Sequence, residues 1–153
     1  MPTKYRGAKD EVRALDTFIK LARAMNSMHA NLARHVAADG DITMSQFGVL
    51  EALLHLGTLS QGDICQKLLL SGSNITTVID NLEKRGFVTR TRRPDDRRVV
   101  EVDLTDSGRK LIGRLFPAHA RRIANLLGAL TVKEQEQLGA LCRTLGKSIV
   151  EPV

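Results

Sequence analysis

The sequence predicts a mainly α-helical fold with one small β-hairpin. Apolar residues recur at helical spacing along most of the 153-residue chain. Only residues 87–92 and 100–104 alternate as strands do, and a turn rich in proline, aspartate and arginine separates them. Seven basic and two acidic residues lie between Lys84 and Arg98, so this segment carries +5 of the net charge of +6. The basic character is therefore local, and it marks the hairpin as a candidate functional surface.

The composition favours one compact domain over residues 1–153. A chain of this length with 42% apolar residues can bury one core but not two large ones. Only 3% of residues are aromatic, which disfavours single-strand nucleic-acid binders that stack bases on aromatic rings. We see no signal peptide, membrane span or disulfide framework in the sequence. We therefore expect a soluble, cytoplasmic protein that does not contact a membrane.

Capping residues place the first two helices. Residues 10–38 form one long helix, and we place its end at Gly40 because glycine readily adopts the left-handed cap conformation. Thr43 and Gln46 have the spacing of a capping box, which opens a second helix that ends at Gly57. A two-helix N-terminal segment is thus expected before the basic hairpin.

The next two helices precede the hairpin directly. A short helix begins at Ser60, and an amphipathic helix follows over residues 73–85 until Gly86 ends it. The apolar stripe of this second helix consists of Ile75, Val78, Ile79 and Leu82. This spacing predicts that one face is buried and that the opposite, polar face is exposed.

Two helical segments follow the hairpin. A helix capped near Thr105 extends to about residue 126, and Pro117 should kink it or divide it in two. Thr131 and Glu134 again have capping-box spacing before the last helix, which carries an apolar stripe to Ile149. Together with the first helix, these segments carry more apolar surface than the central lobe can cover, so we expect a second copy of the chain to cover it.

Short polar side chains occupy the exposed face of helix 73–85. They can bond to base edges in a major groove, and small residues at the helix N-terminus let a phosphate approach its free N–H groups. The candidate contacts are Ser71, Ser73, Asn74, Thr76, Thr77 and Lys84. Asp80 lies on the same face and would repel phosphate, so we expect an arginine to pair with it. Such a face is often merely solvated, but the capped helix before it and the arginine hairpin after it favour nucleic-acid binding.

The hairpin loop concentrates four candidate DNA-contacting arginines, Arg92, Arg93, Arg97 and Arg98. Asp96 can hold Arg98, or Asp95 can hold Arg97, which would orient the guanidinium groups. An oriented arginine at the tip of a hairpin suits a narrow minor groove, where the negative potential is strongest. The hairpin is therefore predicted to contact double-stranded DNA.

Three linked motifs resemble the signature of a known family. Residues 81–88, 95–98 and 104–108 read NLEKRGFV, DDRR and LTDSG. They resemble the MarR (multiple antibiotic resistance regulator) family of bacterial transcription factors, and the similarity extends over essentially the whole chain. The resemblance implies a winged helix-turn-helix homodimer that binds an inverted repeat in double-stranded DNA. Residues 43–104 would form the DNA-binding lobe, and residues 10–38 and 109–150 the dimerisation helices.

The resemblance also implies the roles of individual residues. The helix over residues 73–85 would enter the major groove, with Ser73, Asn74, Thr76 and Thr77 facing the bases. The wing, residues 92–98, would enter the minor groove with Arg97 or Arg98 at its tip. Thr77 stands where relatives often carry a basic residue.

A small aromatic or anionic effector that releases DNA from a repressor is a further implication of the resemblance. It would bind between the dimerisation helices and the DNA-binding lobe. The candidate lining residues are Met25, Met28, His29, Leu32, Phe47 and Leu50. The same spacing is also typical of an ordinary core.

Other functions have less support in the sequence. Cysteine-based redox sensing stays an alternative, but the hydroperoxide sensors of the family carry their thiol near the start of the first helix. Cys65 and Cys142 lie elsewhere, on a buried-looking face and within an apolar stripe, and are expected to be inert fillers. The four histidines lack metal-ligand spacing, so no metal or cofactor is expected. The absence of a phosphate loop, paired carboxylates or a nucleophile motif argues against an enzyme. Sequence-blind DNA packaging and a protein-binding winged-helix module remain open.

Overall fold

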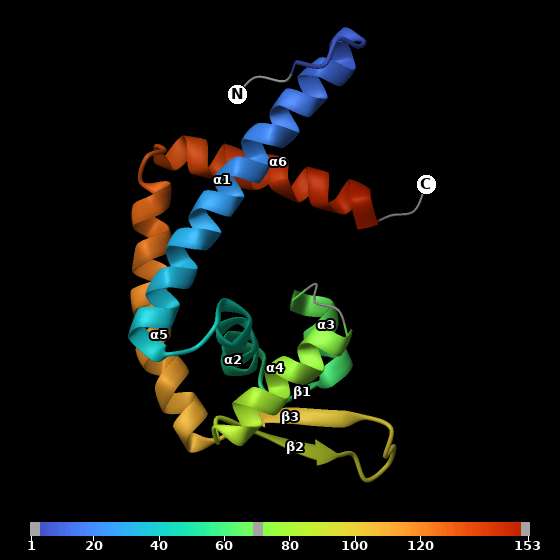
Figure 1. The fold of residues 1–153 in the computed structure, drawn as a ribbon, viewed down its shortest axis with the longest axis vertical. Coiled ribbons are helices and arrows are strands. Elements are labelled where there is room, and N and C mark those ends of the chain that lie inside the picture. Colours follow the sequence, from blue (N-terminus) through green and yellow to red (C-terminus); the bar gives the residue numbers. More distant parts are fainter. Residues whose placement is uncertain (1–3, 69–71, 151–153) are drawn as a thin grey trace. The chain divides into compact units, whose positions relative to one another are not determined.

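A computed structural model describes residues 4–68 and 72–150 of the chain (Figure 1). The elements in chain order are α1 (Lys9–Gly40), α2 (Met44–Leu56), β1 (Leu59–Ser60), α3 (Gln61–Leu68), α4 (Gly72–Lys84), β2 (Val88–Arg92), β3 (Val100–Leu104), α5 (Asp106–Leu127) and α6 (Val132–Val150). The chain divides into two compact units, residues 1–119 and 120–153. The predicted class, mainly helical with a small β-hairpin, is confirmed.

The hairpin belongs to a three-stranded antiparallel sheet with the strand order β1-β3-β2. Leu59 pairs with Val102, and Arg90 pairs with Val102 from the other side. The expectation that the hairpin is the only β-structure is therefore wrong. A two-residue strand is too short to show alternation in sequence, and β1 is a strand only because β3 lies beside it.

The predicted helix caps are confirmed by hydrogen bonds. The Gln46 N–H donates to Thr43 Oγ1 at 3.2 Å, and the Thr43 N–H donates to Gln46 Oε1 at 2.9 Å. The box at Thr131 and Glu134 has the same reciprocal bonds. These bonds satisfy backbone donors that the first turn of a helix leaves without partners.

The end of α1 differs from the prediction by one residue. Gly40 is still helical, and Asp41 adopts the left-handed cap conformation with φ of 51°. A Cβ atom on Gly40 would lie 2.6 Å from Leu115 Cδ1, so the glycine allows α5 to approach α1 closely. Aspartate tolerates left-handed φ better than most residues, which allows Asp41 to serve as the cap.

Pro117 does not divide α5, contrary to one of the two predicted effects. The helix continues through it from Asp106 to Leu127. A proline here removes a hydrogen bond to the carbonyl of Gly113. Both residues are exposed, so water can solvate that carbonyl and lower the cost of the missing bond.

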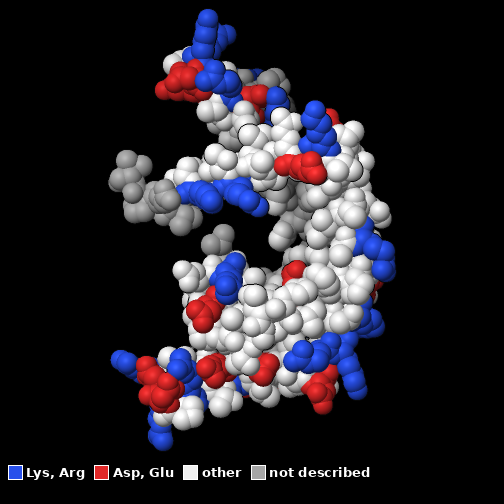
Figure 2. All heavy atoms as spheres, turned by 180° about the vertical axis from the view of Figure 1, so that it is seen from behind, with Lys and Arg blue, Asp and Glu red and all other residues white. Residues whose placement is uncertain are grey.

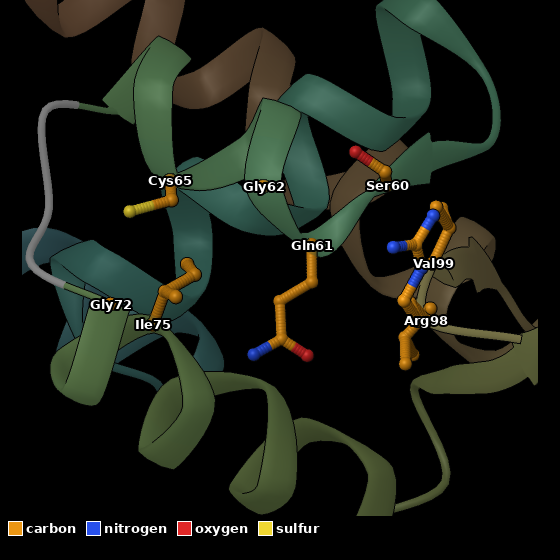
Figure 3. Close-up of a pocket in the computed structure, with 9 residues that line it drawn as sticks. Ser60, Gln61, Gly62, Cys65, Gly72, Ile75, Arg98 and Val99 are labelled. Atoms are coloured by element: carbon orange, nitrogen blue, oxygen red, sulfur yellow. The ribbon is translucent and has the colours of Figure 1, made fainter.

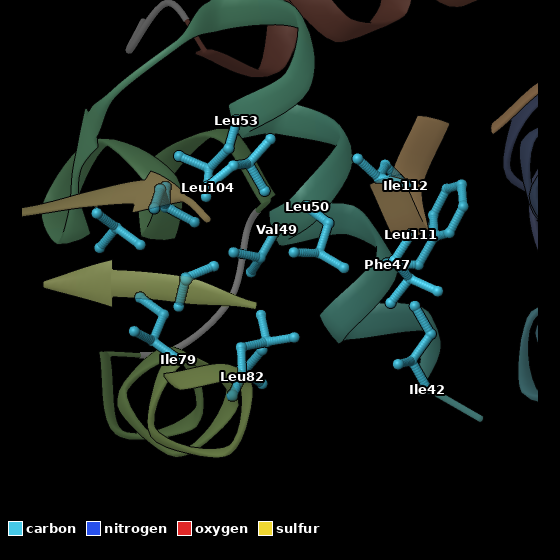
Figure 4. Packing of buried hydrophobic residues seen from close by; sticks show 14 of the residues in the cluster. Ile42, Phe47, Val49, Leu50, Leu53, Ile79, Leu82, Leu104, Leu111 and Ile112 are labelled. Atoms are coloured by element: carbon cyan, nitrogen blue, oxygen red, sulfur yellow. The ribbon is translucent and has the colours of Figure 1, made fainter. Parts of the chain in front are cut away.

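The core of the first unit joins α2, α4, the sheet and α5 (Figure 4). Phe47, Leu50 and Leu53 of α2 are fully buried, and Val102 and Ile112 meet the same cluster from β3 and α5. The predicted stripe of α4 is buried along its whole length. Each such side chain contributes about 1.5–3 kcal/mol on burial. These contacts fix α4 on the lobe with its polar face outward.

α6 carries a row of exposed apolar side chains. Leu138, Leu141, Leu145 and Ile149 recur every three or four residues, and Leu141 and Ile149 are 62% and 73% exposed. Their spacing places them on one face of the helix. The described part of the chain contains no helix long and apolar enough to cross a bilayer.

Candidate nucleic-acid interface

α4 presents the polar face that the sequence predicted. Asn74, Thr76, Thr77 and Lys84 are exposed: Thr77 and Lys84 lie opposite the buried stripe, and Asn74 and Thr76 lie on its flanks. Ser71 lies outside the described residues. Ser73 is part of α4, but its side chain also lies outside the description. Four of the six predicted contacts are therefore exposed on α4.

Thr76 joins α4 to α3. Its hydroxyl donates to the carbonyl of Gly72 at 3.0 Å and accepts a hydrogen bond from Gln61 Nε2 at 2.7 Å. Because its one proton is already donated, Thr76 can serve a further partner only as an acceptor. Gln61 was not among the predicted site residues, although its hydrogen bond to Thr76 links α3 to α4.

Arg90 pairs with Asp80, as expected of some arginine, and also with Glu83. Its Nη1 lies 2.7 Å from Asp80 Oδ1, and its Nη2 lies 2.6 Å from Glu83 Oε2. The bond from Arg90 lowers the pKa of Glu83 below its ordinary value, and Glu83 in turn raises the pKa of Arg90. The sequence showed that Asp80 needed a partner, but not which arginine would reach it.

The wing loop holds its arginines with neighbouring aspartates. Arg98 bonds to Asp96 as predicted, through Nε at 3.0 Å and Nη2 at 3.1 Å. Asp95, by contrast, pairs with Arg93 and not with Arg97, the Arg93 Nη2 lying 2.5 Å from Asp95 Oδ2. Of the two alternatives, the structure therefore has the pair of Asp96 with Arg98, and the pair of Asp95 with Arg97 is not formed. These bonds lower the pKa values of both aspartates and raise those of Arg93 and Arg98.

Arg92 is held in another way. Its Nη1 donates to the main-chain carbonyl of Arg97 at 3.1 Å, so this contact spans the hairpin loop without neutralising charge. Figure 2 shows basic and acidic atoms mixed at the hairpin. Within the described residues, Lys84, Arg92 and Arg97 are the members of the basic segment that pair with no carboxylate. Their charge remains available to an anionic partner.

Arg85 was also missed as a structural contact. Its Nη1 donates to the carbonyl of Asp41 at 2.6 Å, and its guanidinium lies 5.0 Å from the ring centroid of Phe87. This arginine therefore ties the end of α4 to the end of α1. The sequence separation of 44 residues explains why no local pattern indicated the contact.

A surface cavity of about 460 Å³ lies between α3, the start of α4 and the base of the wing (Figure 3). Gln61 points into it, and Cys65 and Arg98 line it. Cys65 is half-buried against the core, whereas Cys142 is exposed on α6. Cys142 adjoins the exposed apolar row of α6, and the expectation that both cysteines are inert fillers stays a prediction.

The predicted effector lining does not surround either described cavity. Phe47 and Leu50 are fully buried in the core, and Leu32 is buried as well. The ring of Phe47 packs 4.4 Å from that of His119, centroid to centroid. Met28 is half-buried, and Met25 and His29 are exposed. Neither of the two cavities found among the described residues of the single chain is lined by these side chains.

The sequence is similar to known transcriptional regulators. A model of the MarR family matches residues 42–100. The uncharacterised HTH-type transcriptional regulator YkoM of Bacillus subtilis (strain 168) is 37% identical over 134 residues, 88% of this chain and 86% of that protein.

Two solved structures have a similar fold. The first is Sco3205, a MarR family transcriptional regulator from Streptomyces coelicolor solved in complex with DNA, with a TM-score of 0.85 and 22% identity over 97% of this chain and 93% of that one. The second is BpsR of Bordetella bronchiseptica, whose DNA binding is regulated by 6-hydroxynicotinic acid, with a TM-score of 0.77 and 28% identity over 85% of this chain and 98% of that one.

Proposed function

Because the chain belongs to the MarR family of transcriptional regulators, we propose that it is a sequence-specific regulator that binds double-stranded DNA as a homodimer. The observation that carries this proposal is the juxtaposition of two surfaces in one lobe. The polar face of α4 is exposed, and in the wing beside it Arg92 and Arg97 pair with no carboxylate among the described residues. Relatives named as HTH-type transcriptional regulators and the DNA-bound relative of the same fold support it.

The two surfaces suit different grooves. α4 would enter the major groove, where Asn74, Thr77 and Lys84 meet base edges and phosphates, and Thr76 accepts hydrogen bonds. The wing would enter the minor groove, with Arg97 and the aspartate-held Arg98 at its tip. Arginine suits this position because its planar guanidinium can be oriented by a carboxylate while its outer N–H groups remain available.

The dimer would form through α1, α6 and the end of α5. The row from Leu138 to Ile149 and the exposed Phe18 and Met25 on α1 supply apolar surface that a second copy can cover. Two-fold symmetry then requires an operator with two inverted half-sites, about 34 Å or one DNA turn apart. This requirement separates the proposal from sequence-blind packaging, which needs no such repeat.

Regulation by a small aromatic or anionic molecule is the second part of the proposal. BpsR, which responds to 6-hydroxynicotinic acid, supports this part. The chain would act as a repressor, and the ligand would release it from DNA. The predicted lining from Met25 to Leu50 would form its pocket in the dimer, because neither of the two cavities found among the described residues is lined by these side chains.

A gel-shift assay tests the proposal. The probe is a duplex from the region upstream of the protein's own gene, with a scrambled duplex of equal composition as the control. We expect retardation of the first duplex at protein concentrations at least about a thousandfold lower than for the second. The variants Arg97→Ala and Arg98→Ala should each weaken the retardation. Equal retardation of both duplexes would instead support sequence-blind binding.

A further inference from the structure

Arg90 occupies the point where the wing meets α4. It lies in the middle of β2, which is an edge strand of the sheet, and it pairs with Val102 of β3. Its main-chain N–H donates outward to Glu83 Oε1 at 3.2 Å, so a side chain of α4 satisfies a donor that the sheet leaves open. The guanidinium adds Nε and Nη2 bonds to Glu83 Oε2 at 3.0 Å and 2.6 Å.

A second carboxylate completes the cluster. Asp80 stands three residues before Glu83 on α4, and its Oδ1 lies 2.7 Å from Arg90 Nη1. The guanidinium thus uses Nε, Nη1 and Nη2 to join one strand to two positions on one helix. The three side chains are 28%, 39% and 37% exposed for Arg90, Asp80 and Glu83, so water only partly screens their attraction.

The charge of this cluster is unfavourable for DNA. Two carboxylates and one guanidinium sum to one negative charge, placed on the helix and strand that are proposed to face phosphates. A cluster that repels the ligand must serve another purpose if the surface binds DNA. Arg92, only two residues further along β2, has no carboxylate partner in the described part of the chain, which shows that the pairing of Arg90 is not a general feature of the strand.

The other structural features that connect the wing to α4 suggest a role for the cluster in holding the two elements together. The turn between α4 and β2 contains Gly86 with φ of 72°, a conformation that glycine adopts without strain. Val88 at the start of β2 is buried, but Arg92 at its far end is exposed. Among the described residues, the hydrogen bonds and ion pairs that join the outer half of β2 to α4 are those of Arg90 with Asp80 and Glu83.

We propose that Arg90 is a positioning residue, which binds Asp80 and Glu83 so that the wing and the recognition helix hold DNA at one fixed angle. The inference rests on the proposed function, because it concerns how the two DNA-contacting elements act together. Arg90 itself does not contact DNA. The repulsion between the two carboxylates and the phosphates lowers the affinity for DNA, and the fixed orientation of Arg97 and Arg98 offsets this loss.

Glu83→Ala tests the inference, because a purely electrostatic effect would raise the affinity for DNA, whereas loss of positioning would lower it. Removal of a negative charge near DNA strengthens binding if the carboxylate is a bystander. Loss of the positioning contact weakens binding instead, by about tenfold, the size of a lost arginine contact. Glu51→Ala on α2 is the matched control, since it removes the same charge from the same lobe without breaking an ion pair in the described residues.

A double-mutant cycle supplies the readout that a general structural defect would not give. The affinity of Glu83→Ala is measured by fluorescence anisotropy with and without Arg97→Ala on the duplex that the wild type binds. If Glu83 acts through the wing, its substitution causes no further loss once Arg97 is gone. An equal loss in both backgrounds, or binding as tight as that of the wild type, overturns the inference.

Two further variants complete the test. The charge swap Glu83→Arg with Arg90→Glu, made together with Asp80→Asn so that no carboxylate faces the new glutamate, restores the attraction in reverse and should recover part of the affinity, whereas a direct contact of Arg90 with phosphate would stay lost. If Glu83→Ala does not fold, as judged by thermal unfolding, Asp80→Asn is carried through the same cycle with the same expected outcomes. If the wild type itself binds no duplex, the proposed function fails. If the wild type binds and the cycle is additive, only the positioning role fails.

Discussion

Carboxylates decide which basic residues of the wing region can neutralise phosphate. Arg85, Arg90, Arg93 and Arg98 each lie within 4 Å of an aspartate or glutamate. Arg97 does not, within the described residues, and its main-chain carbonyl is held by Arg92. At the scale of single residues, the loop is therefore a set of oriented and free cations and not a uniform basic patch.

Arg97→Ala should weaken DNA binding and reduce the salt dependence of the affinity. The slope of log K against log salt is negative, and loss of one cation from a phosphate contact makes it less steep by about 1. Anisotropy titrations at several salt concentrations measure the slope. Lys133→Ala, which removes an exposed cation from α6, should leave it unchanged. An unchanged slope for Arg97→Ala would place this side chain away from the phosphates.

Gly108→Ala should destabilise the fold. A Cβ atom at this position would lie 2.0 Å from the main-chain oxygen of Phe87, so the start of α5 or the turn before β2 must move. Such overpacking costs about 1–3 kcal/mol. Gly113→Ala is the control on the same helix, because its Cβ meets nothing within 4 Å. Alanine there should stabilise the helix by about 0.5–1 kcal/mol. Urea unfolding at fixed protein concentration measures both changes in the free energy of unfolding. Equal changes for the two variants would contradict the close approach of Gly108 to Phe87.

Residue-level prediction from sequence succeeded where the partner is local. The boxes at Thr43 and Thr131 and the pair of Asp96 with Arg98 all join residues two or three apart. It failed for the cap at Asp41, because the need for a glycine at position 40 comes from Leu115 of a distant helix. Local chemistry is visible in a sequence, but close approach between distant elements is not.

Among the elements, the amphipathic pattern of α4 was the most informative. Its stripe predicted both the buried face and the exposed one, and the structure confirms both. β1 could not be predicted, because two residues carry no period and the strand depends on pairing with β3. The continuity of α5 could not be predicted either, since whether Pro117 ends a helix depends on access of water to the freed carbonyl. Periodicity therefore identifies long elements, and tertiary contacts decide short or interrupted ones.

The attachment of the wing to α4 should depend on pH. Arg90 holds the pKa of Glu83 below its ordinary value of 4.5, and Arg93 and Arg98 lower those of Asp95 and Asp96 below 3.8. Carboxylates with a lowered folded pKa contribute stability that is present above the unfolded value and is lost as the pH falls through the folded value. The free energy of unfolding should thus fall below about pH 4.5. Urea midpoints between pH 7 and 3 measure this, and Glu83→Gln should show a smaller fall. Identical profiles for variant and wild type would contradict the role of this pair.

For the whole molecule, the exposed apolar row on α6 predicts an assembly. Leu141→Asp places a charge in the centre of that row, which a second copy would have to bury, so dimers should dissociate. Light scattering coupled to size-exclusion chromatography measures the mass. Ala140→Asp adds the same charge on the opposite side of α6 and should leave the dimer intact. Equal masses for both variants would exclude this row from the interface.

Fold class and family could be recognised from sequence because both depend on long periodic helices and three short motifs. The assembly could be inferred only from surplus apolar surface, and the effector site only from resemblance. The predicted lining shows why: Phe47 and Leu50 belong to the core of the single chain, and a pocket beside them would need a second copy or another arrangement. The residue pattern of a single helix does not determine which pockets form when two chains assemble.

The central claim is that two copies of one surface, a polar helix beside an arginine wing, bind two inverted half-sites together. The most direct measurement is anisotropy on the bound duplex and on duplexes with five or ten base pairs inserted between the half-sites. Five base pairs turn one half-site by about half a turn to the other side of the DNA, and ten restore the facing but add about 34 Å to the separation, so affinity should fall at least about a hundredfold for both duplexes. Equal affinity for all three duplexes would show that the copies do not read the half-sites together, and would contradict the account.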